Sequence, residues 1–291
     1  MAEDPLVAFL AAECGRPLPP ALMAAATAAR DRFGQGVLAV IVYGSCLRDG
    51  EDRGRLVDLY VLVDRLASVH RSPLMRLLNH LVPPNVYYQE CRHEERVVRA
   101  KVALLTLDQL EAGVSATTDN PYFWARFSQP TAIAWIADAE ARARVHTLLA
   151  QAVRTSLGHA LSIEPGAPAD LSLWVRLFAE TYRTELRAEP PSRANELVQA
   201  DQERYAKILT LAAPAALPGG GWGRRRILGK LWSVARLIKA GYTFQGGADY
   251  LAYKIERHSG VVIELTDWER RHPVLAGLCL FWRYRRRGAF R

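Results

Sequence analysis

The sequence predicts an α/β fold, of α+β type, in which a mixed β-sheet with flanking helices precedes a mainly helical region. Three observations predict it. Two short β-rich runs, Leu38–Tyr43 and Asp58–Val63, lie close together near the start of the chain, and two further strands joined by a hairpin follow. From residue 138 onward, apolar residues recur at helical spacing. The expected divisions are residues 1–137, residues 138–212, and a linker with a basic, amphipathic C-terminal region, 213–291.

Local signals place the elements of the first part. The Ala-rich segment Ala21–Phe33 is typical of a helix, and twelve residues of turn and polar chain are expected between the first two strands. Ser-Pro starts, and Pro83-Pro84 stops, a short helix over Ser72–Leu81. The remaining expected elements are strands Asn85–Gln89 and Arg96–Leu105 with a polar hairpin between them, and short helices at Gln109–Glu111 and Asn120–Phe127.

The segment Asp170–Arg187 has the spacing of one amphipathic helix, and Pro190-Pro191 ends it. Glu185 falls on the apolar stripe of this helix. A charged carboxylate rarely enters a core without a partner, so Glu185 is expected to face a cleft, an arginine or a metal. Arg176 and Arg183 fall on the opposite face, where a solvated surface is expected.

Composition favours an ordered globular protein, because half of the residues are hydrophobic and 23% are charged. The scattered cysteines form no CxxC pair, which predicts free thiols in a reducing compartment and no structural zinc. The isolated His70 is expected at the surface. An acidic N-terminus without a basic region, and an apolar run at Pro273–Trp282 too short to span a bilayer, predict a cytoplasmic protein with no signal peptide or transmembrane helix.

Positive charge is concentrated at the C-terminal end. From Arg224 onward there are fifteen Lys and Arg against five Asp and Glu, while the preceding residues carry a slight negative excess. Before this region, the Pro/Gly-rich segment 213–223 indicates a flexible linker rather than a phosphate loop, because no strand precedes it. The last fifteen residues combine five arginines with aromatic side chains, which favours an interfacial helix at an anionic membrane surface over a solvated tail.

The two strands near the start carry a motif for nucleotide chemistry. The first ends at Gly44-Ser45, where a backbone without a bulky side chain can approach a triphosphate, and Asp58 opens the second. An Asp at this place can hold Mg²⁺ against the same phosphates, the layout of polymerase-β-type nucleotidyltransferases. A tight turn followed by a solvated Asp is the simpler interpretation. The usual second Asp is replaced by Tyr60, and Asp64 lies too far along the strand to share an ion with Asp58.

Several short motifs in the same order give a more specific resemblance, over about residues 40 to 200. The chain resembles the peripheral, nucleotidyltransferase-type phosphatidate cytidylyltransferases, the CDP-diacylglycerol synthases typified by the mitochondrial translocator-assembly-and-maintenance protein. The similar segments are Tyr43-Gly44-Ser45, Asp58 through Val63-Asp64, Asn85–Gln89, Arg96–Arg99, Tyr122–Pro130, the set Tyr182, Glu185 and Arg187, and Arg193–Val198, with His70 near a family Trp-His. Cys46, Arg99, Gln129 and Glu185 depart from the family residues.

The resemblance implies that the protein is an enzyme that joins CTP to phosphatidate, giving CDP-diacylglycerol and pyrophosphate in phospholipid biosynthesis. Gly44 and Ser45 would cradle the β- and γ-phosphates, and Asp58 with Glu185 would hold Mg²⁺ or another divalent cation as the catalytic pair. Arg99 and Lys101 alternate onto one face of their strand, where they would bind two anionic substrates or simply cover an exposed sheet face. The expected substrate-binding set is completed by Arg126, Tyr182 and Arg187.

Two alternatives remain open at this point. The first is a nucleotidyltransferase with another acceptor, such as a small molecule, a protein or RNA, which lipid-independent turnover would reveal. The second is a non-enzymatic nucleic-acid binder that uses the basic C-terminal region, for which salt-dependent RNA binding without CTP binding would be the sign. Nucleic acid is not the expected partner, because Asp58 and Glu185 would repel its backbone.

Overall fold

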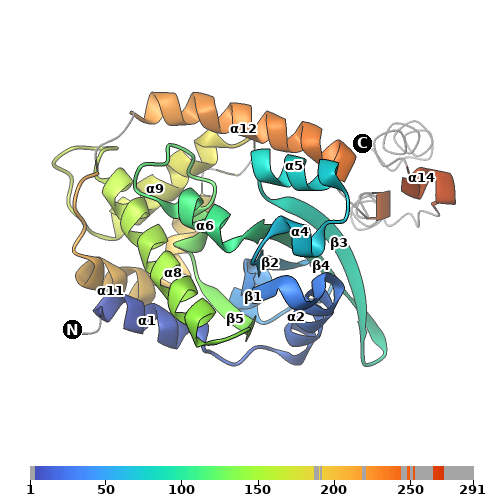
Figure 1. The fold of residues 1–291 in the computed structure, drawn as a ribbon. Coiled ribbons are helices and arrows are strands. Elements are labelled where there is room, and N and C mark those ends of the chain that lie inside the picture. Colours follow the sequence, from blue (N-terminus) through green and yellow to red (C-terminus); the bar gives the residue numbers. More distant parts are fainter. Residues whose placement is uncertain are drawn as a thin grey trace.

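A mixed five-stranded sheet forms the centre of the fold, with strand order β3-β4-β2-β1-β5 (Figure 1). The strands are β1 Val37–Tyr43, β2 Val57–Val63, β3 Asn85–His93, β4 Arg96–Thr106 and β5 Thr131–Ile136. β2 and β4 pair in parallel, whereas the other neighbours are antiparallel. The inner strands β1 and β2 are almost wholly buried, as continuous Val, Ile and Leu runs predict for a sheet covered on both faces.

The computed structural model describes residues 4–186, 190, 192–217, 221–243, 248–249, 252 and 265–271. Arg187 and the arginine-rich end of the chain, two features of the expected site and membrane contact, lie outside these residues. The helices are α1 Pro5–Cys14, α2 Pro20–Phe33, α3 Ser45–Asp49, α4 Leu66–Val69, α5 Pro73–Leu81, α6 Leu107–Val114, α7 Trp124–Phe127, α8 Ala139–Ala160, α9 Leu171–Thr184, α10 Arg193–Gln199, α11 Gln202–Ala212, α12 Trp222–Thr243 and α14 Asp267–Arg271, with the 3₁₀ turn η1 at Gly34–Gly36.

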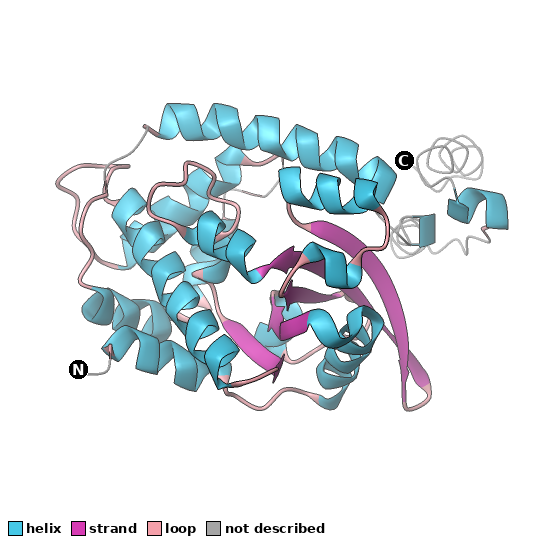
Figure 2. Cartoon of the chain, in the orientation of Figure 1, coloured by secondary structure: helices cyan, strands magenta, loops and turns pink. Residues whose placement is uncertain are grey.

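Helices cover both faces of the sheet (Figure 2). On one face, the small side chains of α2 pack against alternate residues of β1, β2 and β4. On the other face, residues such as Tyr60 and Leu105 join a larger apolar cluster with α1 and with helices α8 to α11. This larger cluster therefore contains residues from both sides of position 138, including Val145, Leu177 and Tyr205.

The mixed α/β architecture is confirmed, as are the helices at Ala21–Phe33 and Ser72–Leu81. The connection between β1 and β2 differs from the prediction, because α3 starts directly at Ser45. The hairpin between β3 and β4 is also tighter than expected. Strand β3 extends to His93, and Glu94 then turns the chain with φ 53°. Among the described helices, none has the length and apolar character needed to cross a bilayer.

The prediction that His70 is exposed was wrong. Its side chain is 7% exposed, and its ring nitrogens lie 3.3 Å from both the Asn79 and Asn85 amide nitrogens and 3.4 Å from the Tyr87 hydroxyl. Burial, with help from the nearby Lys239 and Arg76, lowers the pKa of His70. Three polar partners make burial of this neutral ring possible, so His70 has a structural role beside the start of β3.

Candidate active site

A cavity of about 420 Å³ opens where β1 ends and β2 begins. One wall is formed by the sheet and α3, and the other by α7, the end of α9 and α10. Its lining residues are Tyr43, Gly44, Ser45, Arg48, Asp58, Tyr122, Ala125, Arg126, Gln129, Thr181, Tyr182, Glu185, Pro190, Arg193, Glu196 and Leu197. Six predicted site residues therefore lie in one cavity, although they come from three separate parts of the sequence: Gly44, Ser45, Asp58, Arg126, Tyr182 and Glu185.

Strand register sets the neighbours of Asp58 in the sheet. Asp58 pairs with Tyr43 of β1 on one side and with Lys101 of β4 on the other. Tyr88 of β3 continues the same row beyond Lys101. Directly paired residues project from the same face of a sheet, so the side chain of Lys101 lies on the same face as that of Asp58. The predicted cation Lys101 is thus adjacent to the cavity, although it is not among the residues that line it.

Gly44 lies against Asp58 so closely that no larger residue fits without a shift. It has φ 85° and ψ −163°, a region of the backbone map that essentially only glycine adopts. A Cβ atom at this position would lie 2.8 Å from Oδ2 of Asp58. The glycine therefore serves two local purposes, since it turns the chain from β1 into α3 and leaves space for the carboxylate.

Glu185 reaches the cavity differently from the prediction. Helix α9 ends at Thr184, and Glu185 follows as the capping residue with extended backbone, φ −99° and ψ 160°. It is not part of a helical stripe, but the change of backbone direction turns it into the cavity. One of its carboxylate oxygens lies 3.9 Å from Nη2 of Arg126, so the predicted arginine partner is present. The buried glutamate on the helix itself is Glu180, which forms ion pairs with Arg183 and Arg226.

Three cations surround Tyr122 at the edge of the cavity. The guanidinium carbon of Arg126 lies 5.1 Å from the Tyr122 ring centre, and that of Arg236, on α12, lies 3.7 Å away. Burial alone would raise the pKa of this phenol, but the charges of Arg126, Lys101 and Arg236 outweigh it and lower the pKa. This arrangement concentrates positive charge in a largely buried place, which suits an anionic ligand.

The remaining predicted site residues either lie away from the cavity or fall outside the described residues. Arg99 forms an ion pair with Glu90 at 3.1 Å on the β3–β4 hairpin and does not line the cavity. Arg187 lies outside the described residues. The sequence motifs assigned no site role to Arg48 and Arg193, which line the cavity, although Arg193 begins one of the similar segments, or to Arg236, which contacts Tyr122. An arginine in a basic helix gives no local signal of its partner, so Arg236 could not be recognised from the sequence.

The carboxylates that line the cavity are possible ligands for a metal ion. The described residues contain no group of three or more His, Cys, Asp and Glu side chains suited to a metal ion. Mg²⁺ does not require such a group, because it is commonly held by one or two carboxylates together with substrate phosphates and water. Asp58 and Glu185 line one cavity and carry carboxylate oxygens, the type of ligand that Mg²⁺ takes.

The sequence matches no protein-family model and no curated protein.

Proposed function

We propose that the protein is a nucleotidyltransferase of the phosphatidate cytidylyltransferase type, which converts CTP and phosphatidate to CDP-diacylglycerol and pyrophosphate. One observation carries the proposal: Gly44-Ser45, Asp58, Arg126 and Glu185 line a single cavity. The simpler interpretation, in which Gly44-Ser45 is only a turn and Asp58 only a solvated acid, does not account for this cavity. It gives no reason for Glu185 and Arg126, which are distant in sequence, to lie there as well.

In the proposed reaction, an oxygen of the phosphatidate phosphate forms a bond to the α-phosphorus of CTP. The bond from that phosphorus to the oxygen bridging the α- and β-phosphates breaks, and pyrophosphate leaves with the electron pair. The attacking phosphate is already an anion, so no strong base is required. The chain must instead position two anionic substrates and balance their charge, the terms that dominate phosphoryl transfer.

Cations around the cavity suit this task. Arg126 lines it, Lys101 pairs with Asp58 in the sheet, and Arg236 reaches Tyr122 from α12. Asp58 and Glu185 are the residues that would hold Mg²⁺, which supplies neutralisation of phosphate charge when bound. We also propose peripheral attachment to a membrane, because the lipid acceptor resides in a bilayer.

Incubation of the purified chain with labelled CTP, Mg²⁺ and phosphatidate in detergent tests the proposal directly. The expected result is a labelled lipid with the mobility of CDP-diacylglycerol, formed together with pyrophosphate and absent without phosphatidate. Parallel reactions with ATP, GTP and UTP establish the preference for the base. Label transferred to a protein, to RNA or to a water-soluble acceptor, with no labelled lipid, would instead support the alternative nucleotidyltransferase.

A further inference from the structure

Helix α12 exposes large apolar residues and turns several of its cations inward, the reverse of an ordinary surface helix. The outward residues follow the spacing i, i+4, i+7, i+11 of one helix face and are 41–64% exposed: Ile227, Leu231, Val234 and Ile238. The inward side carries the cations Arg225, Arg236 and Lys239. In Figures 1 and 2, no other described element lies over the outward side of α12.

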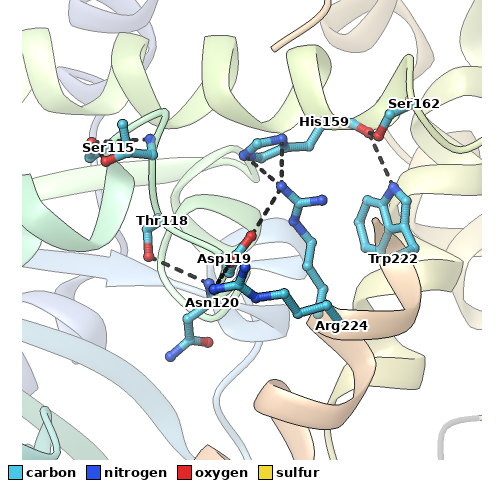
Figure 3. A network of polar contacts seen from close by, with 10 residues as sticks. Ser115, Thr118, Asp119, Asn120, His159, Ser162, Trp222 and Arg224 are labelled. Atoms are coloured by element: carbon cyan, nitrogen blue, oxygen red, sulfur yellow. Dashed lines mark hydrogen bonds and ion pairs between the residues drawn. The ribbon is translucent and has the colours of Figure 1, made fainter. Parts of the chain in front are cut away.

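Polar contacts fix this orientation at the start of the helix. Arg224 and Arg225 form ion pairs with Asp119 at 3.1 and 3.5 Å, and Arg225 also lies 3.1 Å from Nδ1 of His159. The indole of Trp222 donates to the carbonyl oxygen of His159 at 3.2 Å. Figure 3 shows Asp119, His159, Trp222 and Arg224 converging at this junction. The helix cannot roll its apolar side inward without breaking these contacts.

Two more contacts fix the rest of the helix. Arg226 donates two hydrogen bonds to Glu180 of α9, and Lys239 donates to the carbonyl oxygens of Val82 and Pro84, directly after α5. Helix α5 packs beside α12 and exposes Leu74, Leu77 and Leu81 by 53–59%. Two neighbouring helices therefore expose large apolar side chains together.

The charge of these helices identifies what can cover them. Neither α5 nor α12 contains an acidic residue. Of their seven Lys and Arg, Arg225, Arg236 and Lys239 face inward and Arg226 pairs with Glu180. This leaves Lys230, the half-buried Arg76 and Arg224, which is 66% exposed beside Asp119, as the cations available to the outer side. A second copy of this face would bring like charges together, and residues 272–291 of the same chain are also basic, with five arginines and no acid. A bilayer containing anionic phospholipid offers both an apolar interior and the opposite charge.

We propose that α12 and α5 form the face by which the protein docks on an anionic phospholipid bilayer, with the outward residues of α12 entering the headgroup region. This deepens the proposed function and rests on it only for the identity of the lipid acceptor. Docking by this face also explains the position of Arg236. The same helix that touches the bilayer contacts Tyr122 at the cavity, so the site is held beside the lipid surface.

The test measures binding of the full chain to phosphatidylcholine vesicles with and without phosphatidylglycerol, in the absence of CTP. The double variant Leu231→Glu and Ile238→Glu should bind anionic vesicles at least tenfold more weakly than wild type, because two outward apolar residues become charged. Val97→Glu is the matched control, since Val97 is an exposed apolar residue on the β3–β4 hairpin. It should bind as wild type does.

Several results would overturn the proposal: no vesicle binding by wild type, unchanged binding by the double variant, or an equal loss in Val97→Glu. Light scattering after size exclusion would show whether the wild-type protein is a dimer and the double variant a monomer. That result, together with unchanged vesicle binding by the double variant, would assign the face to a second copy of the chain. Activity on a short-chain, water-soluble phosphatidate is measured separately. If it is absent while vesicle binding is normal, the proposed function fails and the docking face stands.

Discussion

Substitution of Gly44 should have two effects that can be measured separately. One is backbone strain, and the other is damage to the site through the close approach to Asp58. Gly44→Ala should destabilise the fold by about 1–3 kcal/mol, since alanine does not readily adopt its backbone angles. It should also abolish nucleotide transfer, because the new methyl group displaces the Asp58 carboxylate. Thermal melts and the cytidylyl-transfer assay measure the two effects.

A second glycine provides the control. Gly34 has similar angles, φ 75° and ψ −149°, but a Cβ atom there would meet nothing within 4 Å. Gly34→Ala should therefore lose similar stability and keep its activity. Equal activity in the two variants would show that the contact between Gly44 and Asp58 does not matter to the reaction.

Asp58→Asn tests the carboxylate charge without a change of shape. The variant should fold normally by circular dichroism and lose more than nine-tenths of its activity, because removal of a metal-binding carboxylate costs on the order of several kcal/mol of transition-state stabilisation. The matched control is Asp64→Asn, directly after the other end of the same strand. Activity of Asp58→Asn near that of the control would remove Asp58 from the mechanism.

At the scale of elements, one ion pair fastens α12 to α9. Glu180 is only 7% exposed and contacts both Arg226 and Arg183. Arg226→Ala should destabilise the protein by about 1–3 kcal/mol, because a nearly buried carboxylate loses its partner on α12. Arg183→Ala, at a 66% exposed side chain on α9 itself, should change stability by less than about 1 kcal/mol. Chemical denaturation of both variants gives the comparison.

The junction of α8 and α12 should make stability depend on pH. Burial, and then the charge of Arg225, lower the pKa of His159 from 6.5 to about 4. Between these values the unfolded chain binds a proton that the folded chain excludes. Stability from this residue is therefore complete above pH 6.5 and falls as the pH drops toward 4, by at most about 3 kcal/mol.

His159→Gln isolates that contribution. The variant lacks the titrating ring, so its stability relative to wild type should rise as the pH is lowered from 7.5 to 4.5, whatever its value at pH 7.5. Denaturant unfolding at several pH values measures this difference. Parallel curves for the two proteins would show that His159 does not titrate on unfolding.

Local patterns predicted much of the sheet and the Gly-Ser and Asp positions, because alternating or continuous apolar runs identify buried strands without knowledge of their partners. The end of α9 was less accessible. Glu185 matched a helical stripe, but the helix ends one residue earlier, and the spacing of apolar residues does not fix a helix end to that precision. Arg236 and His70 depend on partners remote in sequence, and a basic helix or a single histidine does not specify them.

For the whole molecule, the larger apolar cluster predicts how the chain responds to truncation. Tyr60 and Leu105 of the sheet pack in the same cluster as Val145, Leu149 and Leu177 from the later helices. A chain ended at residue 137 would expose one face of its sheet, so it should bind a hydrophobic dye and lack a cooperative thermal transition. A sharp melt for this fragment would show that the sheet and its early helices are stable by themselves.

Strand order also has a consequence for the protein as it is being made. Strand β1 is among the first elements to leave the ribosome, yet its outer neighbour β5 is synthesised last of the five strands. Until β5 emerges, one edge of β1 has no strand beside it, and unpaired edges invite pairing with other chains. Tyr205 and Trp222, which join the apolar cluster, come later still. Native packing of this apolar cluster is therefore completed only after most of the polypeptide has been translated. Slow synthesis near the middle of the chain would prolong the period in which the edge of β1 is unpaired.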